Sequence, residues 1–248
     1  MLDIHAHGDV VELRLNRPPA NALNHALLEA LLSARREAID GGARGLILSG
    51  REGMFCAGID VKELLDCDRA SMSRFWALFF DAARALLTCP IPVVAAVTGH
   101  SPAGGTVLAI NCDYRVAAEG RFKIGLNEVQ VGLTLPPPFM HVFADLVGPR
   151  KARQLAAKGA LMPMSDAFEI GLVDEMVAGD RVLEAALSYL DGLLRLPPVA
   201  MNETRLIGKQ RLVSALEETD DVERATNAWF SDETRQAMQA LADSLKKD

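Results

Sequence analysis

The pattern of apolar and polar residues changes period several times along the chain. Residues 10–15 alternate as a half-buried strand does, whereas residues 24–39 carry apolar side chains at helical spacing. Short apolar runs at residues 45–49 and 92–97 predict buried strands, with an amphipathic helix over residues 72–87 between them. Strands that alternate with helices indicate parallel pairing, so the sequence predicts an α/β fold.

The second half of the chain is predicted to be mostly helical. Residues 104–111 and 114–117 read as a further helix and strand, and after the prolines at 136–138 only a brief strand at 172–173 interrupts the helices. Predicted helices cover 141–146, 150–157, 165–170 and most of the chain beyond 180. We therefore expect a core over residues 1–195 and a helical C-terminal region over residues 196–248.

Composition excludes several classes of function. Half of the 248 residues are hydrophobic, which suffices for a buried core, and the net charge of -7 argues against a nucleic-acid partner. The four cysteines form no C-x-x-C pair, which argues against a zinc site or a disulfide framework. The N-terminus has no signal-peptide pattern, and no apolar run approaches the length of a membrane span, so a cytoplasmic protein without a membrane partner is expected.

Glu128 is the most informative residue, because it lies among apolar side chains with Gly125 and Gly132 on its two sides. Burial raises the pKa of a carboxyl group and makes it a proton shuttle near neutral pH. An acid at the start of a helix is the simpler interpretation. Two glycine turns at residues 55–60 and 99–105 favour a catalytic role for Glu128. Each turn follows a strand, and its backbone N–H groups could donate hydrogen bonds to a ligand oxygen.

The sequence lacks complete motifs for a serine hydrolase, a metal site or a nucleotide-binding site. Ser101, Asp113 and His141 follow the order of a serine hydrolase, but Pro102 has no N–H for the oxyanion hole that this fold requires. The five histidines have no metal-ligand spacing, so no metal is expected. Neither a phosphate-binding P-loop nor a dinucleotide fingerprint occurs, so we expect no cofactor.

Several spaced motifs together resemble the enoyl-CoA hydratase/isomerase (crotonase) family. They are residues 16–23, 55–64, 102–105, 112–115 and 125–132. The resemblance implies a spiral of ββα units and a C-terminal helical region that builds a homotrimer or a dimer of trimers. It also implies an acyl-CoA thioester substrate, with coenzyme A as part of that substrate.

The resemblance assigns a role to each matched position. Glu128 is the expected catalytic base, and the N–H groups of Ala57 and Gly104 are the expected oxyanion hole, where small residues let a thioester oxygen approach the backbone. Asn127 accompanies the base at the substrate. The other expected substrate and coenzyme A contacts are Ala22, Leu23, Gly58, Ile59, Asp60, Val61 and Lys62, although Lys62 could equally be a solvated surface charge.

One departure from the family pattern suggests the subfamily. Hydratases of this family carry a second glutamate where this chain has Val107, so the chain is more similar to Δ3,Δ2-enoyl-CoA isomerases, which work with a single glutamate. Val107 would face the ligand and keep the site dry, or it could be an ordinary core residue.

Three functions are compatible with these residues. They are isomerisation of a 3-enoyl-CoA to the 2-enoyl isomer, another reaction through the same enolate such as hydration, and noncatalytic acyl-CoA binding. Apolar residues of the C-terminal region could form the subunit interface, or they could fold onto their own core. These residues are Leu206, Leu212, Trp229, Phe230, Met238 and Leu241.

Overall fold

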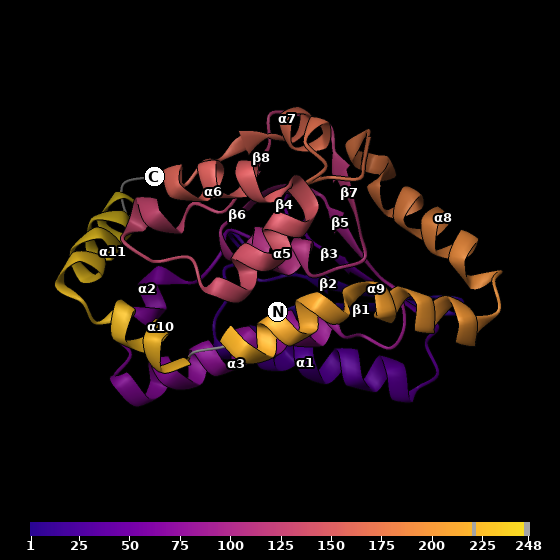
Figure 1. The fold of residues 1–248 in the computed structure, drawn as a ribbon, viewed down its shortest axis with the longest axis horizontal. Helices are drawn as coiled ribbons and strands as arrows, with labels where there is room; N and C mark the ends of the chain where they lie inside the picture. The colour runs from indigo at the N-terminus through magenta and orange to yellow at the C-terminus, as the bar shows by residue number, and fades with distance from the viewer. Residues whose placement is uncertain (220–221, 246–248) are drawn as a thin grey trace.

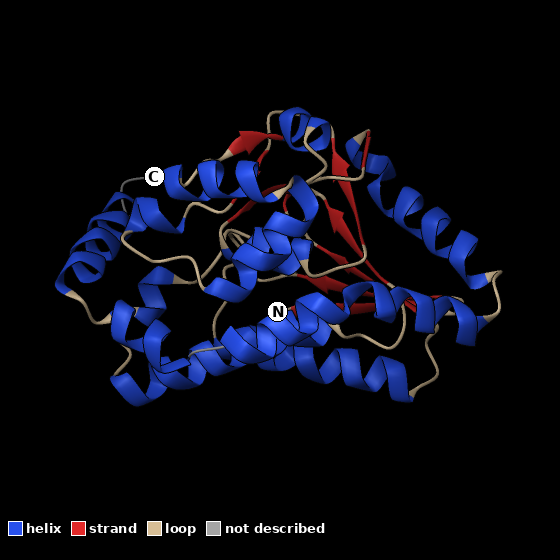
Figure 2. Cartoon of the chain, in the orientation of Figure 1, coloured by secondary structure: helices blue, strands red, loops and turns tan. Residues whose placement is uncertain are grey.

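The structure is a computed structural model that describes residues 1–219 and 222–245. Two sheets and the helices around them form the core (Figures 1 and 2). The larger sheet has the order β1-β2-β3-β5-β7-β10, in which β1 pairs with β2 antiparallel and the other pairs are parallel. Its strands are β1 (Leu2–His7), β2 (Val10–Leu15), β3 (Gly45–Ser49), β5 (Val93–Val97), β7 (Tyr114–Ala118) and β10 (Glu175–Val177).

A smaller sheet has the order β4-β6-β8-β9. β4 pairs with β6 and β6 with β8 in parallel, and β8 pairs with β9 antiparallel. Its strands are β4 (Gly53–Met54), β6 (Gly99–Pro102), β8 (Lys123–Gly125) and β9 (Met162–Pro163).

The helices complete the chain. They are α1 (His25–Asp40), α2 (Val61–Leu64), α3 (Arg69–Leu87), α4 (Gly104–Ile110), α5 (Pro137–Val147), α6 (Pro149–Lys158), α7 (Met164–Glu169), α8 (Val182–Leu194), α9 (Pro198–Thr219), α10 (Val222–Trp229) and α11 (Asp232–Ser244), with 3-10 turns η1 (Glu128–Val131) and η2 (Gly179–Arg181). Among the described residues, no helix combines the length and apolar character needed to cross a membrane.

The chain repeats one path three times. β3, β5 and β7 of the larger sheet are followed directly by β4, β6 and β8 of the smaller sheet, and each pair then leads into a helix or a helical turn. This is the expected spiral of ββα units. The predicted α/β class is thereby confirmed.

Alternation along the strands explains why the larger sheet is covered on both faces. In β3, Leu46 and Leu48 belong to the main hydrophobic cluster, whereas Ile47 faces a second cluster that includes Val182, Ala186 and Leu190. Successive strand residues point to opposite faces, so α8 covers one face and α1, α3 and α4 supply residues to the main cluster on the other.

The C-terminal helices pack onto their own core. α9 is fixed by Asp113, whose carboxylate lies 3.0 Å from Arg205 Nη1 and 2.5 Å from Lys209 Nζ and also accepts the Val93 N–H. α10 packs against α3, and Trp229 of α10 and Trp76 of α3 are both buried. The predicted boundary near residue 195 stays a prediction, and residues 220–221 and 246–248 of the predicted helical region lie outside the described residues.

One predicted strand is displaced. The apolar pair Leu172 and Val173 was expected to form it, but β10 begins at Glu175, after the turn that closes α7. Asp174 accounts for the shift, because its carboxylate accepts the Arg115 N–H and its own N–H donates to the Arg115 carbonyl, which aligns the following residues with β7.

Candidate active site

The fold brings the three expected segments to one edge of the smaller sheet. β4, β6 and β8 run parallel, with Gly53 opposite Gly99 and Pro102 opposite Gly125. Residues 55–60, 103–105 and 126–128 follow these strands directly, so they meet at the carboxyl ends of neighbouring strands, where sites of parallel sheets commonly form.

Tight backbone packing holds the first two segments together. A methyl group built on Gly104 would lie 3.1 Å from Leu23 Cδ1 and 3.2 Å from Gly58 Cα, and one on Gly105 would lie 2.3 Å from the Cys56 carbonyl oxygen. Ala103, which precedes α4, has φ 46, a conformation that non-glycine residues seldom adopt. Strained backbone of this kind is concentrated at functional sites.

Hydrogen bonds distinguish the backbone donors of the first segment. The Ala57 N–H donates to the Ala20 carbonyl at 3.0 Å and is therefore engaged within the protein. The Leu23 N–H donates to the Gly58 carbonyl, and the Asp60 N–H donates to the Leu23 carbonyl. These two bonds involve the residues on either side of Ile59 and leave the Ile59 N–H unused. Among the described residues, the N–H groups of Ile59 and Gly104 have no hydrogen-bond partner. Ile59 directly follows Gly58, and Gly58 packs against Gly104, so the two free donors lie on neighbouring backbone segments.

Glu128 opens η1 and is 8% exposed. Burial raises its pKa from 4.5 to about 7, although a hydrogen bond with its own backbone opposes the rise. Its Oε2 and the Oδ1 of Asn127 are buried without a hydrogen-bond partner within the described parts of the chain. Buried polar atoms are normally paired, so unpaired oxygens on two consecutive residues make this segment a candidate ligand contact. Glu128 is also the first residue of the 3-10 turn η1, so the simpler interpretation, an acid at the start of a helix, fits its position as well.

The other carboxylates of these segments are paired. Asp60 caps α2 and lies 2.7 Å from Arg17 Nη1, and Glu63 lies 3.0 Å from Arg17 Nη2 and accepts from Asn24. Glu128 therefore differs from both in having an unpaired oxygen inside the protein.

The remaining expected contacts lie around these turns. Ala22 is half-buried and Leu23 fully buried, and Val61 and Lys62 begin α2. The exposed Lys62 donates to the Leu245 carbonyl at the end of α11, at 2.9 Å. Val107 of α4 is 1% exposed and belongs to the main hydrophobic cluster. Its expected place beside the ligand stays a prediction.

Two positioning residues escaped the sequence analysis. Asn21, with φ 53, accepts the Arg17 N–H and donates to the Met54 and Phe55 carbonyls, so it ties the first turn to β4. Thr106 accepts the Gly125 N–H, and its hydroxyl lies 2.5 Å from Ser101 O, so it joins α4 to β8. Asn21 lies within the matched motif of residues 16–23, but the motif gave it no role, and no sequence pattern marks Thr106. Both residues act on backbone groups far along the chain, which a local pattern does not reveal.

The serine-hydrolase arrangement does not assemble. The Asp113 carboxylate forms ion pairs with Arg205 and Lys209, and His141 is exposed on α5.

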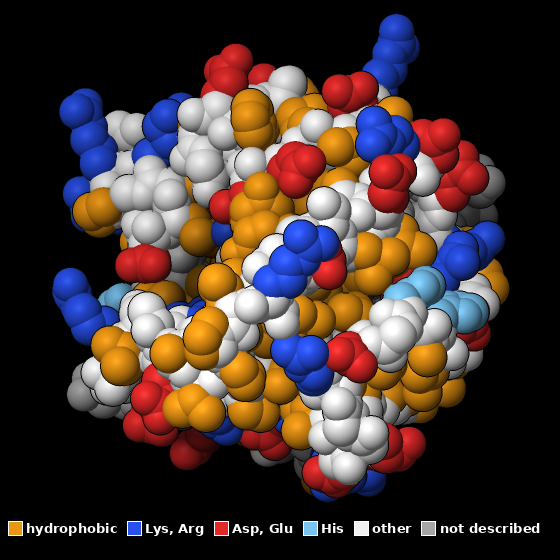
Figure 3. All heavy atoms as spheres, turned by 90° about the vertical axis from the view of Figure 1, so that its right-hand side faces the viewer, with side chains coloured by type: hydrophobic (Ala, Val, Ile, Leu, Met, Phe, Trp, Pro, Cys, Tyr) orange, Lys and Arg blue, Asp and Glu red, His pale blue; other side chains and the backbone are white. Residues whose placement is uncertain are grey.

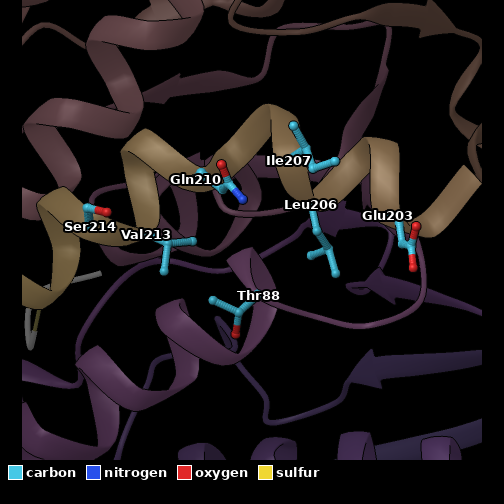
Figure 4. Close-up of a pocket in the computed structure, with 7 residues that line it drawn as sticks. All are labelled: Thr88, Glu203, Leu206, Ile207, Gln210, Val213 and Ser214. Atoms are coloured by element: carbon cyan, nitrogen blue, oxygen red, sulfur yellow. The ribbon is translucent and has the colours of Figure 1, made fainter. Parts of the chain in front are cut away.

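Two cavities have linings that do not include Glu128. One of about 770 Å³ is lined by α9 and Thr88 (Figure 4), and one of about 40 Å³ lies between Phe80, residues 134–137 and α10.

Comparison with known proteins identifies the family. The family model described as enoyl-CoA hydratase/isomerase matches residues 5–247. The chain belongs to the enoyl-CoA hydratase/isomerase family. The resemblance found in the sequence motifs is thereby confirmed.

Relatives within this family include both kinds of enzyme. The human mitochondrial enoyl-CoA delta isomerase 1 is 29% identical over 253 residues, which cover 100% of this chain and 84% of that protein. A probable enoyl-CoA hydratase of Mycobacterium tuberculosis is 32% identical over 193 residues, covering 76% of this chain and 72% of that one. The crystal structure of human mitochondrial delta3-delta2-enoyl-CoA isomerase superposes with a TM-score of 0.94 at 28% identity, covering 99% of this chain and 98% of the other.

Proposed function

We propose that this enzyme is a Δ3,Δ2-enoyl-CoA isomerase that moves the double bond of an enoyl-CoA thioester from C3 to C2. The observation that carries the proposal is the state of Glu128, a buried carboxyl group with one unpaired oxygen and a pKa near 7. Such a group can take a proton and return it at neutral pH. The similarity to the human delta isomerases supports the same reaction.

In the proposed reaction, Glu128 removes a proton from C2 of the 3-enoyl thioester. The electrons shift to the thioester oxygen, and two backbone N–H groups stabilise the resulting dienolate. We propose that these donors are Ile59 and Gly104, because the Ala57 N–H that the motifs suggested already donates to Ala20. Protonated Glu128 then delivers the same proton to C4, so that one carboxyl group completes the cycle.

Val107 supports isomerisation over hydration. Hydration requires a water molecule held for attack at C3, and an apolar side chain at this position supplies no second carboxylate to hold it. The similarity to probable hydratases keeps hydration as the second candidate. Noncatalytic acyl-CoA binding is the third, and an unpaired buried carboxylate argues against it because burial without a partner is costly.

One experiment separates the three functions. The purified protein is incubated with 3-enoyl-CoA and, separately, with 2-enoyl-CoA, and the double-bond position and any hydroxyacyl product are followed. We expect rapid consumption of the 3-enoyl thioester and no hydration of the 2-enoyl thioester. Glu128→Gln should abolish turnover while keeping acyl-CoA binding, because the amide has the size of the acid but cannot accept the proton. Turnover of this variant within a few fold of the wild type would reject the mechanism.

A further inference from the structure

α11 lies against the segment that carries Glu128. It packs on both η1 and α2, at the end of the molecule where Figure 1 places α2 beside α11. A methyl group built on Gly132 would lie 3.1 Å from Thr234 Cα and 3.3 Å from Ala237 Cβ. The first turn of α11 therefore touches the backbone that ends η1.

A single peptide group connects Thr234 to Glu128. The Thr234 hydroxyl donates to the Gly132 carbonyl at 2.5 Å, and the N–H of Leu133, on the same peptide group, donates to the Glu128 carbonyl at 3.0 Å. A peptide group is planar and rigid, so the hydrogen bond at one of its ends restricts the direction of the bond at the other. Orientation at Thr234 is thus transmitted to the backbone of Glu128.

The Thr234 hydroxyl is itself fixed. Thr234 is 1% exposed, and its Oγ1 accepts from Ser231 Oγ at 2.9 Å. Ser231 caps α11 by accepting the Thr234 N–H at 3.2 Å. The hydroxyl therefore accepts one hydrogen bond from Ser231 and donates its single proton to the Gly132 carbonyl.

The opposite side of the same segment is also packed. A methyl group on Gly159, which ends α6, would lie 2.9 Å from Val129 Cγ2 and 2.8 Å from Gln130 Cγ. η1 therefore lies between α6 and α11, and the Thr234 hydrogen bond is a polar contact on the α11 side.

We propose that Thr234 is a positioning residue for the reaction, which holds the Glu128 carboxyl group in its buried orientation through the Gly132 and Leu133 peptide group. The proposal rests on the proposed function for its kinetic effect. Thr234 itself touches neither substrate nor reacting atoms. Its loss should therefore lower kcat more than it raises KM.

The test compares Thr234→Val with Thr234→Ser, and uses Thr226→Val as the matched control. Thr226 is also buried, and its hydroxyl donates to the Val222 carbonyl within α10, away from η1. We expect Thr234→Val to lower kcat by about 10- to 100-fold with KM within about threefold. Thr234→Ser should recover most of the rate, and Thr226→Val should stay within about twofold of the wild type.

A second readout does not depend on activity. Carbon NMR of protein labelled at the glutamate carboxyl carbons, with Glu128→Gln to assign the signal, follows the titration of Glu128 directly. The titration midpoint should lie near pH 7 in the wild type and in Thr226→Val. It should fall toward 4.5 in Thr234→Val, because a carboxyl group no longer held in place reaches water.

The outcomes separate the two proposals. A wild-type protein that does not isomerise 3-enoyl-CoA rejects the proposed function, and the NMR titration then tests the role of Thr234 alone. An unchanged kcat and midpoint in Thr234→Val would overturn the positioning role, as would an equal loss in Thr226→Val. If Thr234→Val does not fold, Thr234→Ala takes its place, since it also removes the hydroxyl that donates to the Gly132 carbonyl. A kcat and midpoint equal to those of the wild type would then overturn the proposal.

Discussion

At the scale of single residues, Glu128 combines a chemical advantage with an energetic cost. Burial favours its neutral form and raises its pKa to about 7, which suits proton transfer. The same burial means that ionisation of Glu128 lowers the free energy of unfolding. A carboxyl group whose pKa is higher in the folded than in the unfolded state stabilises the fold below pH 4.5, and this contribution is lost as the pH rises through about 7.

Glu128→Gln should therefore be more stable than the wild type at alkaline pH. A shift from 4.5 to about 7 corresponds to roughly 3 kcal/mol between the two limits. Urea unfolding should show a gain approaching this value at pH 8 and a small difference at pH 5. Glu52→Gln, which changes an exposed glutamate, is the control and should gain little. Equal stability of Glu128→Gln and wild type at pH 8 would show that the folded protein ionises this group without cost.

The sequence marked candidate site residues but not their hydrogen bonds. Glu128 and Gly104 stood out because a lone acid among apolar residues and a glycine-rich turn are local patterns. The choice of Ile59 over Ala57 depends on a bond from Ala57 to Ala20, 37 residues earlier, and Thr234 contacts a residue 102 positions away. Such pairings depend on the complete fold, so no local pattern encodes them.

At the scale of elements, the start of α4 sets the distance between the two proposed oxyanion donors. Gly104 leaves room for Leu23 and Gly58, and a methyl group here would lie 3.1 Å and 3.2 Å from their nearest atoms. Such spacings are tighter than ordinary van der Waals contacts, so the two segments would have to separate by a few tenths of an ångström. An oxyanion hole depends on donor distances of this order.

Gly104→Ala should therefore lower kcat by about tenfold or more, with little change in the circular dichroism spectrum. Gly192→Ala is the matched control, because a methyl group at this position of α8 meets nothing within 4 Å. It should leave kcat unchanged and raise stability by about 0.5 to 1 kcal/mol. Steady-state kinetics and thermal melts decide the matter. Wild-type kcat in Gly104→Ala would place the oxyanion donors elsewhere.

Long elements were predicted well and short ones were missed. α1 and α3 carry many turns of apolar spacing, and β3 and β5 are continuous apolar runs, so each has a strong local signal. β4 and β9 have two residues each, which is too short for any alternation to be visible. The smaller sheet, which aligns the three site segments, was therefore absent from the sequence prediction although its turns were recognised.

At the scale of the whole molecule, the C-terminal region both covers its own core and leaves an apolar surface. Trp229 and Met238 were considered for a subunit interface, but both are fully buried within their own chain. Ile207 of α9 is 62% exposed and Val199 is 68% exposed. In Figure 4, Leu206 and Val213 point from α9 toward Thr88 and line the cavity of about 770 Å³.

The connection from α8 to α9 also carries an exposed apolar side chain. It contains Leu196, which is 48% exposed, and it lies on the right-hand side of Figure 1. Apolar side chains gather across the middle of that face in Figure 3. We propose the outer side of α9 as part of the interface of a homotrimer or a dimer of trimers, because exposed apolar patches of this kind commonly mark contacts between subunits.

Ile207→Glu should therefore weaken assembly. A charge at a buried interface loses hydration without gaining a partner, so the molar mass measured by light scattering should fall toward that of one chain at micromolar concentration. Phe168→Glu on α7 is the control, since Phe168 is 48% exposed but lies on another helix. A wild-type protein that is already monomeric would remove the interface, and equal dissociation of both variants would place it elsewhere.

The packing of α10 on α3 also gives the protein a built-in optical reporter. The two tryptophans of the protein are Trp76 on α3 and Trp229 at the end of α10, and both are buried. Detachment of α10 would expose an indole ring to water and shift its fluorescence emission to longer wavelength, while the sheets still contribute to circular dichroism. Unfolding followed by both signals thus shows whether residues 1–195 and the later helices melt together. Coincident transitions would mean that the tail and the core form one cooperative unit, whatever the boundary in the sequence.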